Sequence, residues 1–122
     1  MRVVRAFAAL VVAMALLATP ATSFAANRYV TYVACSTSKQ APAATSCLKS
    51  SAKAAFFKSR DASVTYKVCV RFPSGTKLCA TGQSAPQGAK RVNTITSSMK
   101  GTHKVTWFVG GSQVGAWTFQ VT

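Results

Sequence analysis

Acidic side chains are almost absent from this chain. Its 122 residues contain no glutamate, one aspartate, Asp61, and one histidine, His103. Glycoside hydrolysis normally needs two carboxyl groups, so the composition excludes that chemistry. A hydrolytic triad could be built only from Asp61, His103 and a serine, and no G-x-S-x-G elbow accompanies these residues. We therefore expect a protein without catalytic residues, not an enzyme.

The motifs that hold metals and phosphates are also missing. No C-x-x-C pair occurs, and His103 lies far from every cysteine in the sequence, which argues against a zinc site. The pair Gly110 and Gly111 lacks the lysine and helix that follow a phosphate-binding loop. We expect neither a metal nor a small-molecule cofactor.

The first residues predict export. Arg2 and Arg5 precede an apolar run of thirteen residues, and a small-residue cleavage pattern ends at Ala25. The run is shorter than the roughly 17 to 25 residues of a membrane-spanning helix. We predict a signal peptide over residues 1–25 and one secreted domain over residues 26–122, located outside the cell or associated with its wall.

Four cysteines belong to the expected mature domain, namely Cys35, Cys47, Cys69 and Cys79. An even number of cysteines in an exported domain predicts two disulfides. Three pairings are possible. We favour bonds between sequence neighbours, which would close two short loops within local hairpins.

Short β-strands separated by turn residues dominate the mature part. Strands are expected over residues 28–35, 63–72, 76–80, 92–96, 105–109 and 114–121. Residues 51–58 suit either a strand or one helical turn, whereas residues 36–46 and 81–91 are expected to be loops because they are rich in small and turn-forming residues. Gly115 indicates a bulge or a close backbone contact inside the last strand. The pattern predicts an all-β fold, an antiparallel sandwich or a small β-barrel.

The central hairpin has a predictable register. Residues 73–75, Pro-Ser-Gly, supply its turn. A three-residue turn places Cys69 opposite Cys79, so pairing of the strands itself brings these two cysteines together. The same register makes Arg71 and Lys77 like-charged neighbours, which costs stability unless their side chains splay into water or share an anion.

The C-terminal stretch, residues 101–121, combines a glycine-led strand, a short glycine turn and an aromatic-rich returning strand. It resembles the closing hairpin of bacterial secreted immunoglobulin-like domains, and this resemblance implies an immunoglobulin-like β-sandwich. The layout is also similar to that of small exported β proteins of soil bacteria, such as chromoprotein carriers and amylase or protease inhibitors. The resemblance does not assign a function to any residue of this chain.

Positive charge is the main functional signal. Once Arg2 and Arg5 leave with the signal peptide, thirteen Lys and Arg face one acid, which gives a net charge of +12. Such a surface attracts polyanions, although charge that merely keeps an exported protein in solution is the alternative. The candidate binding residues are Lys67, Arg71 and Lys77 on the central hairpin, with Lys53, Lys58, Arg60, Lys90 and Arg91 in or near loops that could extend the same face.

Four aromatic residues are candidates for stacking on sugars or bases, namely Tyr29, Tyr32, Trp107 and Trp117. Burial in the core is the favoured role of the two tryptophans. Tyr29 and Tyr32 have opposite parity on one strand, so at least one should face outward.

These features predict a secreted, non-enzymatic binding module for anionic polymers of the cell envelope or its surroundings. The alternative is a small inhibitor or antimicrobial effector that acts through a disulfide-bounded loop, residues 36–46 or residues 73–75.

Overall fold

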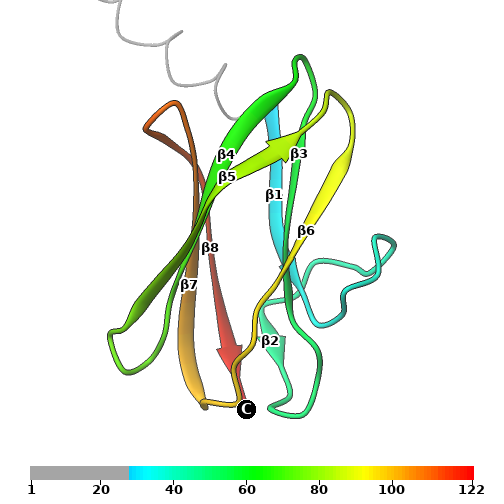
Figure 1. Cartoon of the computed structure of the whole chain (residues 1–122). Helices are drawn as coiled ribbons and strands as arrows, with labels where there is room; N and C mark the ends of the chain where they lie inside the picture. The colour runs from blue at the N-terminus through cyan, green and yellow to red at the C-terminus, as the bar shows by residue number, and fades with distance from the viewer. Residues whose placement is uncertain (1–27) are drawn as a thin grey trace, which may run out of the picture.

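The computed structural model describes residues 28–122, so the predicted signal peptide lies outside the described part of the chain. In that part the chain forms eight strands (Figure 1). Their bounds are β1 Tyr29–Ala34, β2 Ser46–Cys47, β3 Ala54–Ser59, β4 Val64–Arg71, β5 Lys77–Ala85, β6 Lys90–Thr94, β7 Gly101–Val109 and β8 Ser112–Val121.

The strands form two sheets that pack face to face (Figure 1). One sheet has the order β1-β3-β6 and the other the order β2-β8-β7-β4-β5. The neighbouring strands are antiparallel, except that β2 runs parallel to β8. Each sheet keeps its own edges, so the predicted sandwich is confirmed and the barrel alternative is wrong.

The core lies between the two sheets. Successive side chains of a strand point to opposite faces, so alternate residues of each strand meet in the middle. Phe57 of β3, Tyr66 and Val68 of β4, Trp107 of β7 and Phe119 of β8 are all buried there. Burial of each such side chain contributes roughly 1.5–3 kcal/mol to folding, which makes this cluster the main source of stability.

A second, smaller cluster lies on the outer face of the three-stranded sheet. Phe56 is fully buried there, stacked on Tyr32 with ring centroids 4.8 Å apart and covered by Ala41 of the loop that follows β1. Strand β3 is therefore buried on both faces, so its sequence has no apolar alternation. This burial explains why residues 51–58 were ambiguous between strand and helix.

The hairpin of β4 and β5 has the predicted register. Cys69 pairs with Cys79 and Arg71 with Lys77, and the Cys69–Cys79 disulfide is present. The turn is closed by a backbone hydrogen bond in which the Phe72 amide donates to the carbonyl of Thr76 at 2.8 Å. Turn chemistry in the sequence was sufficient to set the pairing.

The prediction of a loop over residues 81–91 is correct only for residues 86–89. Strand β5 continues to Ala85 and β6 begins at Lys90, two residues before the expected start. The register shifts between Tyr66 and Val68 because β5 holds an extra residue there, and Gly82 has a φ of +64°. A bulge that contains glycine accounts for this stretch, which sequence patterns alone assign to a loop.

The last hairpin confirms both expectations for Gly115. Gly110 and Gly111 form the turn with φ of +58° and +80°, as a tight two-residue hairpin turn requires. The register shift in β7–β8 leaves Val114 without a partner, which is a bulge directly before Gly115. A Cβ atom on Gly115 would overlap the side chain of Thr31 in β1, so the glycine also permits a close approach of the two sheets.

The Cys35–Cys47 disulfide is confirmed, but it does not lie within a hairpin. Cys35 follows β1 in one sheet, and Cys47 belongs to β2 in the other. The bond therefore joins the two sheets at one edge of the sandwich. The sequence separation of 12 residues indicated a local loop, but it carried no information on which sheet each end would join.

Candidate polyanion-binding surface

Three basic residues form a row across the outer face of the five-stranded sheet. Arg71 of β4 pairs with Lys77 of β5 on one side and with Lys104 of β7 on the other. Neighbouring strands lie about 4.8 Å apart, so the three positions are close together. We call Lys77, Arg71 and Lys104 the basic row; all three side chains are exposed.

The basic row borders a shallow hollow of about 390 Å³, lined by Arg71, Pro73, Gly75, Thr102 and Lys104 among others. A guanidinium nitrogen of Arg71, Nη1, donates a hydrogen bond to the carbonyl of Gly75 at 3.2 Å. This bond holds the guanidinium beside the turn and leaves its other donors free for an anion. The hollow thus presents the cations of Arg71 and Lys104 and the hydroxyl of Thr102 on one open surface.

Lys67 lies on the same face of β4, four residues before Arg71. Its Nζ lies 4.6 Å from the centre of the Phe108 ring. A cation over an aromatic ring is attracted by about 0.5–1 kcal/mol at exposed sites, so part of the Lys67 charge is engaged locally. Lys67 extends the basic row but is held closer to the sheet than its three members.

Lys53 does not belong to any exposed basic face, which corrects the sequence-based expectation. Its side chain is 2% exposed, and its ammonium donates hydrogen bonds to the carbonyls of Lys49 at 3.2 Å and Ser51 at 2.8 Å. A buried lysine needs such acceptors because an unpaired buried charge is costly. Lys53 therefore holds the β2–β3 connection together.

Lys58 and Lys90 lie on the opposite side of the molecule from the basic row. They pair with one another across β3 and β6, on the outer face of the three-stranded sheet. Lys90 lies 5.3 Å from the centre of the Tyr32 ring and donates a hydrogen bond to the carbonyl of Lys39 at 3.1 Å. The expected extension of the central hairpin's face by these residues is therefore wrong.

Arg60 and Arg91 are exposed but also lie apart from the basic row. Arg60 belongs to the β3–β4 connection, where its carbonyl accepts a hydrogen bond from the Gln87 side chain at 3.3 Å. Arg91 lies on the edge strand β6 and pairs with Phe57 of β3. The positive charge is thus spread over the surface. In the basic row, three basic residues are direct neighbours on three adjacent strands.

Lys104 was missed by the sequence analysis. Its place beside Arg71 depends on the pairing of β4 with β7, strands that are separated by 29 residues in the chain. Local turn chemistry sets the β4–β5 register, but it does not set a register between strands this far apart. The alternation of residues 104–109 could have shown which face of its strand Lys104 occupies.

The two residues of the conceivable triad lie apart. Asp61, in the β3–β4 connection, lies 4.0 Å from Arg28, and both side chains are largely exposed. His103 is fully buried at the start of β7, near the other end of the sandwich (Figure 1). Its Nδ1 lies 3.1 Å from the carbonyl of Gly101 and its Nε2 lies 2.8 Å from Ser97 Oγ. The histidine is a hydrogen-bonded core residue.

The aromatic candidates are engaged in packing. Trp107 is fully buried, as expected, and Trp117 is half-buried with its Nε1 donating to the carbonyl of Ala44 at 2.8 Å. Tyr29 stacks on Phe57 in the core, whereas Tyr32 is on the outer face, which confirms that one of the two points outward. Packing on Phe56 and Lys90 leaves little of Tyr32 free for stacking.

Comparison with solved structures gives the fold a name. An immunoglobulin-like protein from Pseudomonas aeruginosa superposes with a TM-score of 0.51 and 13% sequence identity, over 77% of this chain and 91% of that chain. The fold is immunoglobulin-like. At this identity the likeness extends to architecture alone. Two disulfides in a small immunoglobulin-like domain are consistent with an oxidising compartment outside the cytoplasm.

A weaker structural match is an alkylpurine DNA glycosylase from Pseudomonas fluorescens, AlkC, bound to DNA containing an abasic site analog. It has a TM-score of 0.43 and 14% identity, and the match covers 77% of this chain but only 30% of that enzyme. This match carries no argument about function. No protein-family model matches the chain, and no curated protein matches it in sequence.

Between residues 28 and 122, no helix is long and apolar enough to cross a membrane. The same stretch holds no group of three or more His, Cys, Asp or Glu side chains that could bind a metal ion. All four cysteine sulfurs are engaged in disulfides, so they are not available as thiolate ligands.

Proposed function

We propose that this protein is a secreted, non-enzymatic binding module for anionic polymers of the cell envelope or its surroundings. The basic row carries this proposal. Lys77, Arg71 and Lys104 are placed side by side on three strands, and the one acidic side chain of the chain lies beside Arg28 instead. The adjacent positive charges repel each other, and an anion bound across them relieves that repulsion.

The shape of the surface favours a polymer over a small anion. The basic row lies on an open sheet face with all three side chains in solvent, and no closed pocket is needed to reach it. Each exposed contact with a single anion is weak, because water and salt screen it. A chain of repeated phosphates or carboxylates makes several such contacts at once and so gains affinity through their number.

The proposed location follows from the predicted signal peptide together with the disulfides. An exported basic domain meets anionic envelope polymers directly, and its cross-links persist outside the cytoplasm. We propose that the mature chain acts in the medium or on the wall.

The test is binding to inorganic polyphosphate at pH 7 over a range of salt concentrations. The triple variant Lys77→Ala, Arg71→Ala, Lys104→Ala should bind more weakly at every salt concentration. The dependence of the logarithm of affinity on the logarithm of salt should become shallower by roughly one for each lost contact.

The matched control removes three exposed lysines elsewhere, Lys39→Ala, Lys49→Ala and Lys100→Ala. This variant has the same net charge as the triple variant in the basic row. Equal loss of binding in both variants would show that net charge alone, and not the basic row, attracts the polymer.

The alternative of an inhibitor or antimicrobial effector stays a prediction. The loop of residues 36–46 packs against the domain. Its Ala44 amide donates to the carbonyl of Val33 at 2.8 Å, and its Ala41 covers Phe56. Residues 73–75 border the basic row. Neither loop presents a feature that favours a protein target.

A further inference from the structure

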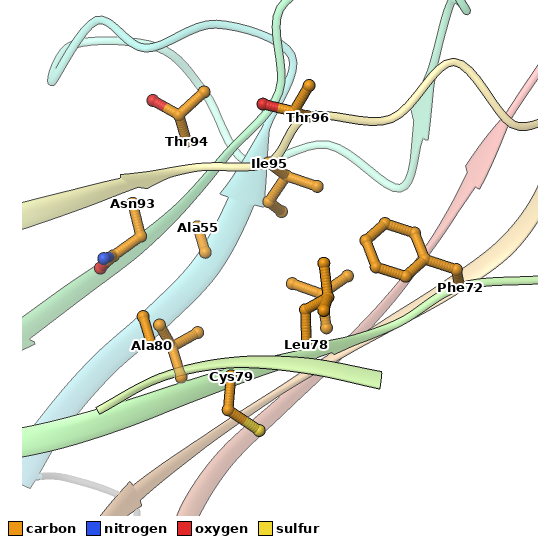
Figure 2. A pocket seen from close by; sticks show the side chains of 11 residues that line it. Ala55, Phe72, Leu78, Cys79, Ala80, Asn93, Thr94, Ile95 and Thr96 are labelled. Carbon is orange, nitrogen blue, oxygen red and sulfur yellow. The ribbon is translucent and has the colours of Figure 1, made fainter. Parts of the chain in front are cut away.

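The two long sides of the sandwich differ. On the side of β1 and β8, the Cys35–Cys47 disulfide joins the two sheets, and the Trp117 indole donates a hydrogen bond to Ala44 of the β1–β2 connection. On the side of β5 and β6, a hollow of about 280 Å³ opens between the sheets (Figure 2). This volume is close to the lower limit of ligand pockets, roughly 300 Å³.

The hollow is lined mainly by apolar side chains. Ile95 and Leu78 face each other across it, with Phe72 at one end (Figure 2), and Val68 and Val70 line it as well. None of its eleven lining residues is charged, although the chain is rich in lysine and arginine. Leu78 belongs to the inward-facing side of β5 and is nevertheless 62% exposed. An uncovered apolar surface of this kind is typical of a binding site.

One end of the hollow is closed by hydrogen bonds. The Tyr66 hydroxyl donates to Oδ1 of Asn93 at 2.5 Å, and Nδ2 of Asn93 donates to Oε1 of Gln83 at 3.1 Å. These contacts connect β4, β5 and β6. Burial raises the pKa of the Tyr66 phenol, and the charge of Arg91 lowers it by a smaller amount.

Beyond the closed end of the hollow, the edge strands β5 and β6 carry features that hinder pairing with another strand. β6 begins with Lys90 and Arg91, and β5 carries the bulge at Gly82. Charged residues and bulges on edge strands prevent the addition of further strands. Addition of a strand along the full length of this margin is therefore disfavoured, whereas a flexible alkyl chain in the hollow needs no backbone partner.

Lys77 lies at the margin of the sandwich on which the hollow opens. It directly precedes Leu78 on β5, the outermost strand of its sheet, and it is exposed. A long lysine side chain at a sheet edge can keep its ammonium in water beside an apolar surface. Apolar walls with one cation at the rim are complementary to a molecule that has an alkyl chain and an anionic head.

We propose that the hollow between β5 and β6 binds a single-chain anionic amphiphile, with the alkyl chain between Leu78 and Ile95 and the anionic head at Lys77. This site is separate from the proposed polymer contact, because it opens on the inner face of the sheet and Arg71 and Lys104 are on the outer face. Lys77 is shared by the two sites.

The experiment titrates the protein with sodium decanoate below its micelle concentration and measures displacement of a fluorescent fatty acid. Decanoate should bind at least tenfold more tightly than decyltrimethylammonium, which has the same chain and the opposite charge. Ala80→Leu should weaken binding at least tenfold, since Ala80 lines the hollow and a larger side chain fills it. Leu78→Ala, at an exposed position, should weaken binding without unfolding the protein.

Three charge variants complete the test. Lys77→Ala should weaken decanoate binding several-fold, whereas Lys39→Ala, which removes the same charge from a distant loop, should not. The pair Arg71→Ala, Lys104→Ala should reduce polyphosphate binding and leave decanoate binding intact, which separates this site from the proposed function. Absence of decanoate binding would overturn the proposal, as would unchanged binding in both Ala80→Leu and Leu78→Ala or equal binding of the cationic amphiphile.

Discussion

A single missing side chain lets the two sheets approach each other on one side of the sandwich. Gly115 of β8 lies against Thr31 of β1, and the space in which a Cβ would sit is taken by the Thr31 side chain. Close packing leaves no room for an added methyl group without movement of the backbone. Gly115 is needed here for its size, since its φ is not in the left-handed region.

Gly115→Ala should destabilise the protein by about 1–3 kcal/mol, the usual cost of overpacking. Addition of Thr31→Ala should recover part of the loss, because it removes two of the three overlapping atoms. Urea denaturation of both single variants and of the double variant measures the effect. Additive losses in the double variant would show that the two residues do not collide.

Single residues also show where sequence reasoning stops. The alternation in residues 63–72 correctly placed Arg71 on the outer face, because strand periodicity decides the face. Lys53 could not be recognised as buried, since its burial depends on the carbonyls of Lys49 and Ser51 that fold around it. A charge in the sequence does not reveal whether its partners will be water or backbone.

At the scale of elements, the two disulfides have different structural roles. Cys69–Cys79 lies inside a hairpin that its own strand pairing already holds. Cys35–Cys47 instead joins two sheets and fixes the loop whose Ala41 covers Phe56. Both close short loops, with sequence separations of 10 and 12 residues, so loop entropy alone predicts similar contributions.

Removal of each disulfide by paired alanine substitutions should therefore give unequal results. Cys69→Ala with Cys79→Ala should cost about 3 kcal/mol, the loop-entropy value. Cys35→Ala with Cys47→Ala should cost more, because the freed loop also uncovers Phe56. Urea midpoints under non-reducing conditions make the comparison, and equal costs in the two variants would contradict the proposed role of the loop.

Elements differ in how far the sequence predicts them. The turn at residues 73–75 and the alternation of β4 set the central hairpin correctly. The bulge at Gly82 concealed the second half of β5, because a glycine among small polar residues is also the signature of a loop. β3 was ambiguous for another reason. It is buried on both faces, so its sequence lacks the alternation of apolar and polar residues that marks a half-buried strand.

At the scale of the whole molecule, charge opposes folding. The predicted mature chain has a net charge of +12, and one ion pair is formed among residues 28–122, between exposed Arg28 and Asp61. Exposed pairs of this kind contribute about 0–1 kcal/mol, so the ion pair offsets little of the mutual repulsion. Added salt shortens the range of the repulsion from about 30 Å at 0.01 M to about 10 Å at 0.1 M.

The melting temperature should therefore rise with sodium chloride between 0.01 and 0.5 M. A gain of about 1 kcal/mol corresponds to roughly 4–8 °C for a domain of this size. The variant Lys39→Ala, Lys49→Ala, Lys100→Ala should gain less, because it starts with a lower charge. Thermal unfolding followed by circular dichroism measures both, and a melting temperature independent of salt would refute the expectation.

The overall class of the fold was predictable because turn residues and alternation recur along the whole chain. The assembly of the sheets was not, since it depends on contacts such as β4 with β7 and β1 with β8 that no local pattern encodes. The candidate site likewise has a part that local patterns predict and a part that depends on long-range strand pairing. Two members of the basic row come from one hairpin and were predicted, and the third comes from a strand far along the chain.

The unequal sides of the sandwich give the two layers a preferred direction of relative motion. The Cys35–Cys47 bond joins the layers covalently at one margin, whereas at the margin of β5 and β6 they are joined by the hydrogen bonds of Asn93 to Tyr66 and Gln83. Thermal motion that separates the layers should therefore begin at the open part of this margin, where it breaks side-chain hydrogen bonds at most and no strand ladder. A guest larger than the resting hollow can be admitted by this motion while the hydrogen bonds within each sheet remain intact.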